Sequence, residues 1–171
     1  MRSPRRIAVA TGTRAEFGLL RPVLQAIDAH PDLELLVYAA GSHLLPPALT
    51  IEEVRAAFPV AAEVPMQEPD ATGRLADAAA FGRGASGFAE ALRRDEPDVL
   101  LVLGDRIEAF AAASAAAIGG VRVAHLHGGD VAEGIADDSI RHAITKLAHI
   151  HLPATARSTE RIIAMGEPPS R

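Results

Sequence analysis

The sequence predicts an α/β protein with a doubly wound parallel sheet, and three observations lead to this fold class. Apolar runs of strand length alternate with helix-like stretches along all 171 residues. The cleanest run, 98–103, is almost wholly apolar, as expected for a parallel strand that is covered on both faces. A hydrophobic content of 49% is enough for a packed core of one domain.

The first half of the chain predicts three strands and three helices. The first helix has apolar residues three and four positions apart, at Leu20, Val23, Leu24 and Ile27. A polar stretch with a proline at 67–70 predicts a loop before the long third helix. The strands are expected at 7–11, 33–39 and 61–65, the helices at 16–30, 50–58 and 72–94, and the core contacts of the long helix at Leu75, Phe81, Phe88 and Leu92.

The second half continues the same alternation. Ile140, Ile144 and Leu147 predict the apolar stripe of a helix that begins near residue 137. The turn-like sequence after residue 165 is typical of a linker. The strands of this half are expected at 98–103, 121–126 and 149–153, and its other helices at 107–118 and 156–165.

The composition excludes several classes of protein. A net charge of −5 and a pI near 5.8 argue against a nucleic-acid partner, which would need a concentrated basic face. The chain has no cysteine, so disulfides and thiolate metal sites are excluded. No apolar stretch is long enough for a membrane span or for the core of a signal peptide. We therefore expect a cytoplasmic protein with no membrane partner.

Common cofactor and nucleophile motifs are missing as well. The glycines of loop 12–18 do not have the GxGxxG spacing of dinucleotide-binding proteins, and neither a P-loop nor a GxSxG elbow occurs. His125 and His127 lack the spacing of HExxH zinc sites, which disfavours a zinc enzyme. The sequence therefore predicts no metal and no bound cofactor.

In a doubly wound sheet the loops that follow the strands share one cleft. Here these loops hold Arg14, His43, Asp105 and His127. Arg14 at the start of a helix suggests a bound anion, although it could instead be solvated or pair with Glu16. Asp105 is expected at the floor of the cleft, although it could also cap the next helix, and a lone loop histidine such as His43 is more often structural.

The densest cluster of chemical groups is 137–142, Asp-Asp-Ser-Ile-Arg-His. Asp137 and Arg141 stand four positions apart, as do Asp138 and His142, so each pair shares one face of a helix. These acids could simply balance the helix dipole. The histidines, glycines and acid just before them, at 125–130, favour acid/base chemistry in a partly closed cleft.

Four motifs in this order together resemble the UDP-N-acetylglucosamine 2-epimerases, most closely the hydrolysing branch that serves sialic-acid-type sugar synthesis. The motifs are Gly-Thr-Arg-Ala-Glu-Phe-Gly at 12–18, Gly-Asp-Arg at 104–106, His-Leu-His-Gly-Gly-Asp at 125–130, and the helix 137–147. The resemblance implies the Rossmann-like amino-terminal domain of a two-domain GT-B fold over residues 1–166. It also implies that 167–171 is a truncated linker and that a carboxyl-terminal nucleotide-binding domain is absent.

The implied reaction is elimination of UDP from a UDP-sugar, followed by addition of water with inversion at C2. The product would be N-acetylmannosamine or a related 2,4-diacetamido sugar. By resemblance, Arg14, Asp105, Asp137, Arg141 and His142 face the sugar and its diphosphate. The acid/base group stays open between His127, Asp130 and Asp137; His127 stands where many members have glutamate, a variant associated with the branch that makes diacetamido sugars.

The expected site therefore has four candidate catalytic residues and four candidate substrate-binding residues. The resemblance also suggests a homodimer through the long helices and a separate carboxyl-terminal half as a partner. The alternative function is a non-catalytic sugar-nucleotide-binding or assembly module derived from this family. The candidate catalytic residues are Asp105, His127, Asp130 and Asp137, and the candidate binding residues are Arg14, His43, Arg141 and His142.

Overall fold

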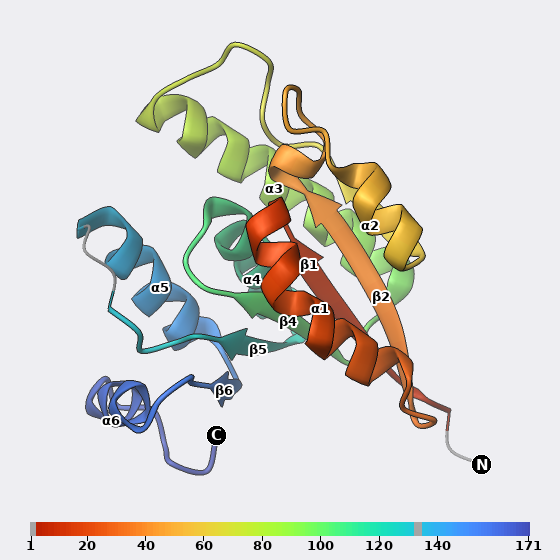
Figure 1. The fold of residues 1–171 in the computed structure, drawn as a ribbon. Helices are drawn as coiled ribbons and strands as arrows, with labels where there is room; N and C mark the ends of the chain where they lie inside the picture. Colours follow the sequence, from red (N-terminus) through yellow and green to blue (C-terminus); the bar gives the residue numbers. More distant parts are fainter. Residues whose placement is uncertain (1–2, 132–134) are drawn as a thin grey trace.

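The computed structural model of the chain describes residues 3–131 and 135–171, with side chains described from 138 onward in the second range. The described strands form one parallel sheet in the order β3-β2-β1-β4-β5-β6, flanked by helices (Figure 1). The strands are β1 (Arg5–Thr11), β2 (Leu33–Ala40), β3 (Val60–Val64), β4 (Val99–Leu103), β5 (Arg122–Leu126) and β6 (Ile150–Leu152). The helices are α1 (Arg14–Asp28), η1 (Gly41–His43), α2 (Ile51–Ala57), α3 (Arg74–Asp95), α4 (Ile107–Ile118), α5 (Ile135–Leu147) and α6 (Ala156–Ala164).

The strand order reverses direction between β1 and β4. The chain builds outward from β1 to β3, then returns to pair β4 with β1, with Ile7 opposite Val99. This is the switch point at which doubly wound sheets bind their ligands, beyond the carboxyl ends of the strands. The predicted fold class, a doubly wound parallel sheet, is therefore confirmed.

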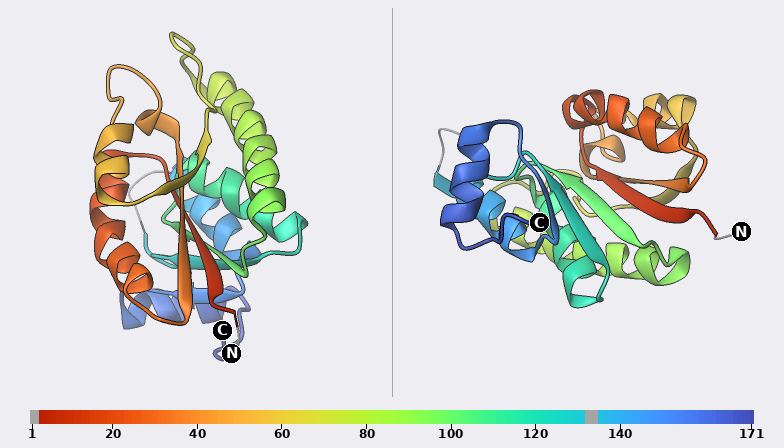
Figure 2. Two further views of the ribbon diagram at one scale, coloured as in Figure 1. Left: turned by 90° about the vertical axis from the view of Figure 1, so that its right-hand side faces the viewer. Right: turned by 90° about the horizontal axis from the view of Figure 1, so that it is seen from below.

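Successive residues of the central strands face opposite sides of the sheet and enter two separate cores. Ala8 and Leu100 belong to the core beneath α3, α4 and α5, whereas Val9 and Leu101 belong to the core beneath α1 and α2. Figure 2 shows these two groups of helices on opposite faces of the sheet. Because both faces are covered, β4 is apolar throughout, which is the pattern that the sequence displayed at 98–103.

Helices α3 and α4 pack closely because small residues line their contact. Ala111, Ala112 and Ala116 of α4 are fully buried. At Gly84 of α3, an added Cβ would lie 3.1 Å from the Cβ of Ala111 and 2.9 Å from the terminal carbon of Met66. Glycine at this position therefore permits the close approach of the two helices.

Leu75 is the exception among the expected core contacts, and that prediction was wrong. Its side chain is 88% exposed, whereas Phe88 and Leu92 are buried as expected. The first turns of α3 extend beyond the body of the sheet, so no described element covers them (Figure 1). Within the described part of the chain, no helix is both long and apolar enough to span a membrane.

Candidate functional site

The candidate site lies at the carboxyl ends of β4 and β5, where an ion pair joins two motifs. Gly104 turns the chain after β4 in a left-handed conformation, with φ +73°, and Asp105 follows it. The Asp105 carboxylate accepts a hydrogen bond from the guanidinium of Arg141 on α5. Nε of Arg141 is buried and has no hydrogen-bond partner among the described residues. Asp105 thus engages α5, and the alternative that it caps α4 is not supported, because α4 has no side-chain cap.

A buried histidine braces both halves of this ion pair. Nε2 of His125 donates to the carbonyl oxygen of Gly104 at 2.8 Å, and Nδ1 lies 3.2 Å from the hydroxyl of Thr145 on α5. Burial lowers the pKa of His125 to about 4, so the ring is neutral at pH 7. Contacts at both ring nitrogens of His125 therefore hold the Gly104 turn and α5 together.

The loop after β5 carries a second polar chain. Nδ1 of His127 lies 2.7 Å from the carboxylate of Asp130, which also accepts a 2.5 Å hydrogen bond from the hydroxyl of Ser158 on α6. Burial alone would raise the pKa of Asp130, but the hydrogen bonds from Ser158 and His127 outweigh it and hold this pKa below its ordinary value. The His127 side chain is 42% exposed, and its Nε2 makes no hydrogen bond to any described residue.

Glycines at 128 and 129 are required by the packing of this loop. A Cβ at Gly128 would lie 2.9 Å from Nδ1 of His125. At Gly129, which has φ +76°, a Cβ would lie 2.3 Å from the carbonyl oxygen of Ser158. The chain between His127 and Asp130 can follow this path only without side chains at 128 and 129.

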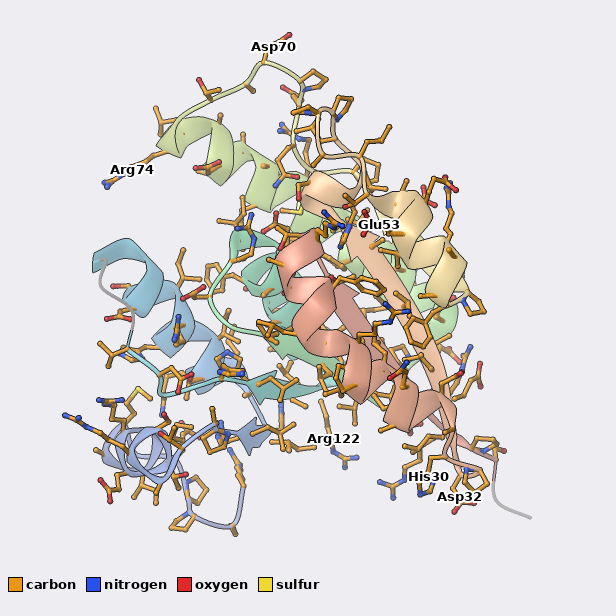
Figure 3. All side chains as sticks on the ribbon, in the orientation of Figure 1. His30, Asp32, Glu53, Asp70, Arg74 and Arg122 are labelled. Carbon is orange, nitrogen blue, oxygen red and sulfur yellow. The ribbon has the colours of Figure 1, made fainter. Side chains whose placement is uncertain are left out.

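The remaining predicted residues lie around these two groups. Arg14 begins α1, and its side chain is 74% exposed. It pairs at 3.0 Å with Glu53 of α2, which is labelled in Figure 3. His142 is half-buried, and its buried Nδ1 has no partner in the described ranges. The side chain of Asp137 lies outside the described part of the chain.

His43 occupies a position inside the protein. It is fully buried, with Nε2 3.1 Å from the hydroxyl of Thr11 and Nδ1 2.7 Å from that of Thr50. Phe17 meets its ring edge to face. These contacts give His43 a bracing role between β1 and the segment before α2, and substrate contact by His43 stays a prediction.

Two buried carboxylates were not anticipated from the sequence. Glu16 does not pair with Arg14; it accepts a 2.7 Å hydrogen bond from the backbone N–H of Gly12. Burial raises the pKa of Glu16 to about 7, and the negative charge of Glu108 adds to this rise. Glu108 is buried beside it and accepts hydrogen bonds from Arg106 at 3.2 Å and from Gln67 at 3.0 Å.

The loops after β1 and β2 wrap around Glu108. A Cβ at Gly12 would lie 2.7 Å from the Glu108 side chain, and a Cβ at Gly41 would lie 2.3 Å from its carboxylate. A sequence signal for this cluster exists, because glutamate occurs in the first turn of both α1 and α4, directly after a glycine-containing loop. Glutamate is seldom fully buried, however, so residue type alone does not predict this cluster.

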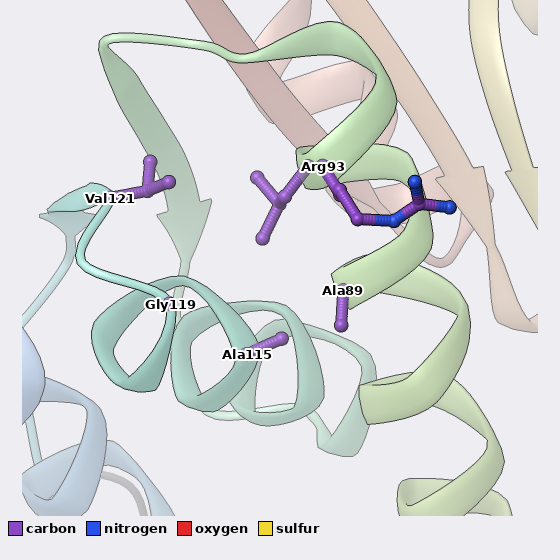
Figure 4. A pocket seen from close by; sticks show the side chains of 6 residues that line it. Ala89, Arg93, Ala115, Gly119 and Val121 are labelled. Carbon is purple, nitrogen blue, oxygen red and sulfur yellow. The ribbon is translucent and has the colours of Figure 1, made fainter.

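Hollows flank Asp105 on two sides. One, of about 270 Å³, lies toward α1 and includes Glu16 and Leu19 in its wall. The other, of about 230 Å³, lies toward α5 and includes Arg106 and Ile140. A further hollow between the carboxyl-terminal ends of α3 and α4 (Figure 4) includes Val121, which precedes β5, so it lies at the opposite end of the sheet.

Among the residues that the structure describes, no group of three histidine, aspartate or glutamate side chains could hold a metal ion. The arrangement instead offers an ion pair, an imidazole with one open nitrogen and a carboxylate that orients it. These groups suit proton transfer beside a bound anion.

Comparison with known proteins gives these features a family context. Residues 25–171 match the model of a family described as UDP-N-acetylglucosamine 2-epimerase. The chain belongs to this family. It is 41% identical over 167 residues to the hydrolysing UDP-N,N'-diacetylbacillosamine 2-epimerase of Legionella pneumophila, covering 95% of this chain and 43% of the relative. It is 36% identical over 169 residues to the UDP-N-acetylglucosamine 2-epimerase of Neisseria meningitidis, covering 95% of this chain and 42% of that protein.

Solved structures agree with the family at the level of the fold. The crystal structure of UDP-GlcNAc 2-epimerase from Neisseria meningitidis bound to UDP-GlcNAc superposes with a TM-score of 0.83 at 19% identity. The similarity covers 96% of this epimerase-family chain and 44% of that one. The chain thus spans less than half the length of the relatives that it matches, and it has the fold of the amino-terminal domain of a GT-B protein.

Proposed function

We propose that this chain supplies the amino-terminal half of a hydrolysing UDP-sugar 2-epimerase. The substrate would be UDP-N-acetylglucosamine or a UDP-2,4-diacetamido sugar, and the product would be N-acetylmannosamine or the corresponding diacetamido sugar. In this reaction the C2 proton and the UDP group leave, which forms a C1–C2 double bond. Water then adds its oxygen to C1 and a proton to the opposite face of C2.

The observation that carries the proposal is the His127–Asp130 pair beside the Asp105–Arg141 ion pair. Nδ1 of His127 is held by Asp130, which is itself anchored by Ser158. This bond fixes the tautomer in which Nδ1 carries the proton, so that Nε2 presents a lone pair to the site. We therefore assign His127 as the base that takes the C2 proton and Asp130 as the residue that orients it.

Inversion at C2 requires a proton donor on the face opposite the base. Asp105 follows the strand next to that of His127, and it lines hollows on two sides. We assign this role to Asp105: its carboxylate takes a proton from the water that adds to C1 and passes it to C2. Asp137 is the alternative, because the family resemblance includes it. Arg141 is the cation beside this carboxylate, and its unpartnered Nε suits a phosphate oxygen of the departing UDP.

We further propose that turnover needs a second domain. The relatives are more than twice as long as this chain, and Asp105 borders open hollows on two sides. An open site admits water and loses the positioning that accelerates elimination. Arg14, His43 and His142 stay proposed substrate contacts, to be made when the cleft closes, and a cytoplasmic location stays a prediction.

The test joins residues 1–171 to the carboxyl-terminal portion of the Legionella relative and measures UDP release from both UDP-sugars. We expect release by this fusion, with the free 2-epimeric sugar detected by NMR. His127→Gln and Asp105→Asn should each lower the rate by about 10²-fold or more, the scale of a lost general acid or base. Asp70→Asn, on the exposed loop before α3, is the matched control and should leave the rate unchanged.

Two outcomes would contradict the assignment. Equal rates in the parent fusion and in both active-site variants would show that these groups do not carry the chemistry. Binding of a UDP-sugar by calorimetry, with no product from the fusion, would favour the non-catalytic module instead.

A further inference from the structure

The hollow beside Asp105 continues into a larger one that the reaction itself does not use. Asp77, Ile107 and Ile140 line both. The larger hollow measures about 480 Å³ and lies between the amino-terminal parts of α3 and α4 and helix α5. We call it the α3–α5 hollow; its walls include Asp77, Ala78, Phe81, Ile107, Phe110 and Ile140.

Apart from Arg74 and Asp77, the residues that line the α3–α5 hollow are apolar. Phe81 and Phe110 stack with ring centroids 4.9 Å apart and an interplanar angle of 28°. Ile107 and Ile140 are half-buried against the same core. Such walls favour a methyl group over a hydroxyl, because a hydroxyl would lose its water without gaining a partner.

One polar acceptor stands where the two hollows meet. Asp77 is exposed, and its carboxylate makes no hydrogen bond or ion pair with any described residue. A carboxylate at the entrance and carbon atoms within suit a group that combines an N–H donor with a methyl. An acetamido group has both.

We propose that the α3–α5 hollow binds the acetamido group at C4 of a 2,4-diacetamido UDP-sugar and so determines which UDP-sugar the site accepts. The inference rests on the proposed function. The C2 acetamido group sits on the reacting carbon, beside Asp105 and His127, so the substituent that extends into the neighbouring hollow belongs to another ring carbon. Asp77 accepts from the amide N–H, and the methyl lies between the phenylalanines and the isoleucines.

UDP-N-acetylglucosamine would fill this hollow poorly. It carries a hydroxyl at C4, which reaches the carboxylate of Asp77 but leaves the apolar interior empty or wet. The difference between the two sugars is therefore felt at Phe81, Phe110 and the isoleucines, not at the ion pair.

The test compares two leucine substitutions at neighbouring exposed alanines of α3. Ala78 lines the hollow and Ala79 does not, so Ala78→Leu fills the hollow while Ala79→Leu is the matched control. In the fusion described above, Ala78→Leu should lower kcat/KM for UDP-N,N'-diacetylbacillosamine relative to UDP-N-acetylglucosamine by about 10-fold or more. Ala79→Leu should leave this ratio within about two-fold, on the scale expected for an exposed substitution.

The outcomes separate this inference from the proposed function. The inference is overturned if Ala78→Leu changes kcat/KM equally for both UDP-sugars, or for neither. UDP release by the fusion would still support the proposed function in that case. A change in the sedimentation coefficient with Ala78→Leu alone would mean that a second copy covers the hollow, which also overturns it.

If the fusion releases no UDP from either sugar, the proposed function fails, and the hollow is tested directly in the 171-residue chain. The methyl NMR signals of Ile107 and Ile140 are then followed with each UDP-sugar. The inference is supported if these methyl signals shift with the diacetamido sugar alone and no longer shift in Ala78→Leu. It is overturned if the signals shift equally with both UDP-sugars or with neither.

Discussion

Glu16→Gln tests whether a buried carboxylic acid lies beneath the loop after β1. Burial raises the pKa of Glu16 from its ordinary 4.5 to about 7, so the folded protein binds a proton there over a range in which the unfolded chain has released it. The stability that Glu16 contributes is therefore fully present below pH 4.5 and is lost as the pH rises to about 7.

The size of this effect follows from the two pKa values. At about 1.4 kcal/mol per pH unit, a rise from 4.5 to about 7 corresponds to about 3 kcal/mol. Glutamine keeps the oxygen that accepts from the Gly12 N–H and cannot ionise. Relative to the parent, Glu16→Gln should change stability little at pH 4.5 and raise it by up to about 3 kcal/mol at pH 7.5.

Urea denaturation at several pH values between 4.5 and 7.5 measures the free energy of unfolding of both proteins. Using their difference removes the contribution of every other titrating group. Glu53→Gln is the control, because Glu53 is exposed and its substitution should give no such pH-dependent gain. If the difference in free energy of unfolding between Glu16→Gln and the parent stays constant with pH, Glu16 does not have a raised pKa in the folded protein.

Three further predictions concern the His125 brace, the close contact at Gly129 and the core contacts of α3. Burial lowers the pKa of His125 from its ordinary 6.5 to about 4, so the stability that this residue contributes is present above pH 6.5 and is lost toward pH 4. In urea denaturation at several pH values, His125→Gln should abolish about 3 kcal/mol of this pH dependence. If the pH profile of the free energy of unfolding does not change, His125 is not a neutral brace. Gly129→Ala should cost more than about 2 kcal/mol, because its Cβ would meet a backbone oxygen of α6, whereas Gly120→Ala, with φ +77° and open space, should cost only about 1 kcal/mol. If thermal unfolding shows the same loss of stability in Gly129→Ala and in Gly120→Ala, the contact with Ser158 is ruled out. Leu75→Ser should change the free energy of unfolding by less than about 0.5 kcal/mol, whereas Phe88→Ala should cost about 3–5 kcal/mol. A large loss of stability in Leu75→Ser would mean that the Leu75 side chain is covered.

The sequence was sufficient for the strands and helices because each has a clear apolar period. Strand β4 and helix α4 match their predicted ranges closely, since one is apolar on both faces and the other is flanked by turn residues. Helix α1 begins two residues before its predicted start. Thr13 caps it by accepting from the N–H of Glu16, and this local hydrogen bond leaves no mark in the hydrophobic pattern.

The sequence predicted Asp105 and Arg141 as candidate residues but did not predict that they pair with each other. Arg141 and Asp105 are 36 positions apart, and only the order of the sheet brings them together. Spacing on one helix predicts Asp137 as a neighbour of Arg141, and that side chain lies outside the described residues; helical periodicity relates only residues of the same element, so it could not predict Asp105 as well. The burial of Glu16 was not predicted for a related reason. Its hydrogen-bond partner is the backbone N–H of Gly12, and backbone groups give no signal in the sequence.

The brace at His125 has a consequence for how this family can vary. One ring bonds the carbonyl of Gly104 and faces the hydroxyl of Thr145, so three separate segments depend on a single side chain. A relative that replaced this histidine with an apolar residue would leave the carbonyl oxygen of Gly104 without its side-chain donor, whereas the Thr145 hydroxyl would keep its 3.0 Å hydrogen bond to the carbonyl oxygen of Arg141. Position 125 should therefore keep a hydrogen-bond donor among homologues, and apolar residues there should be rare.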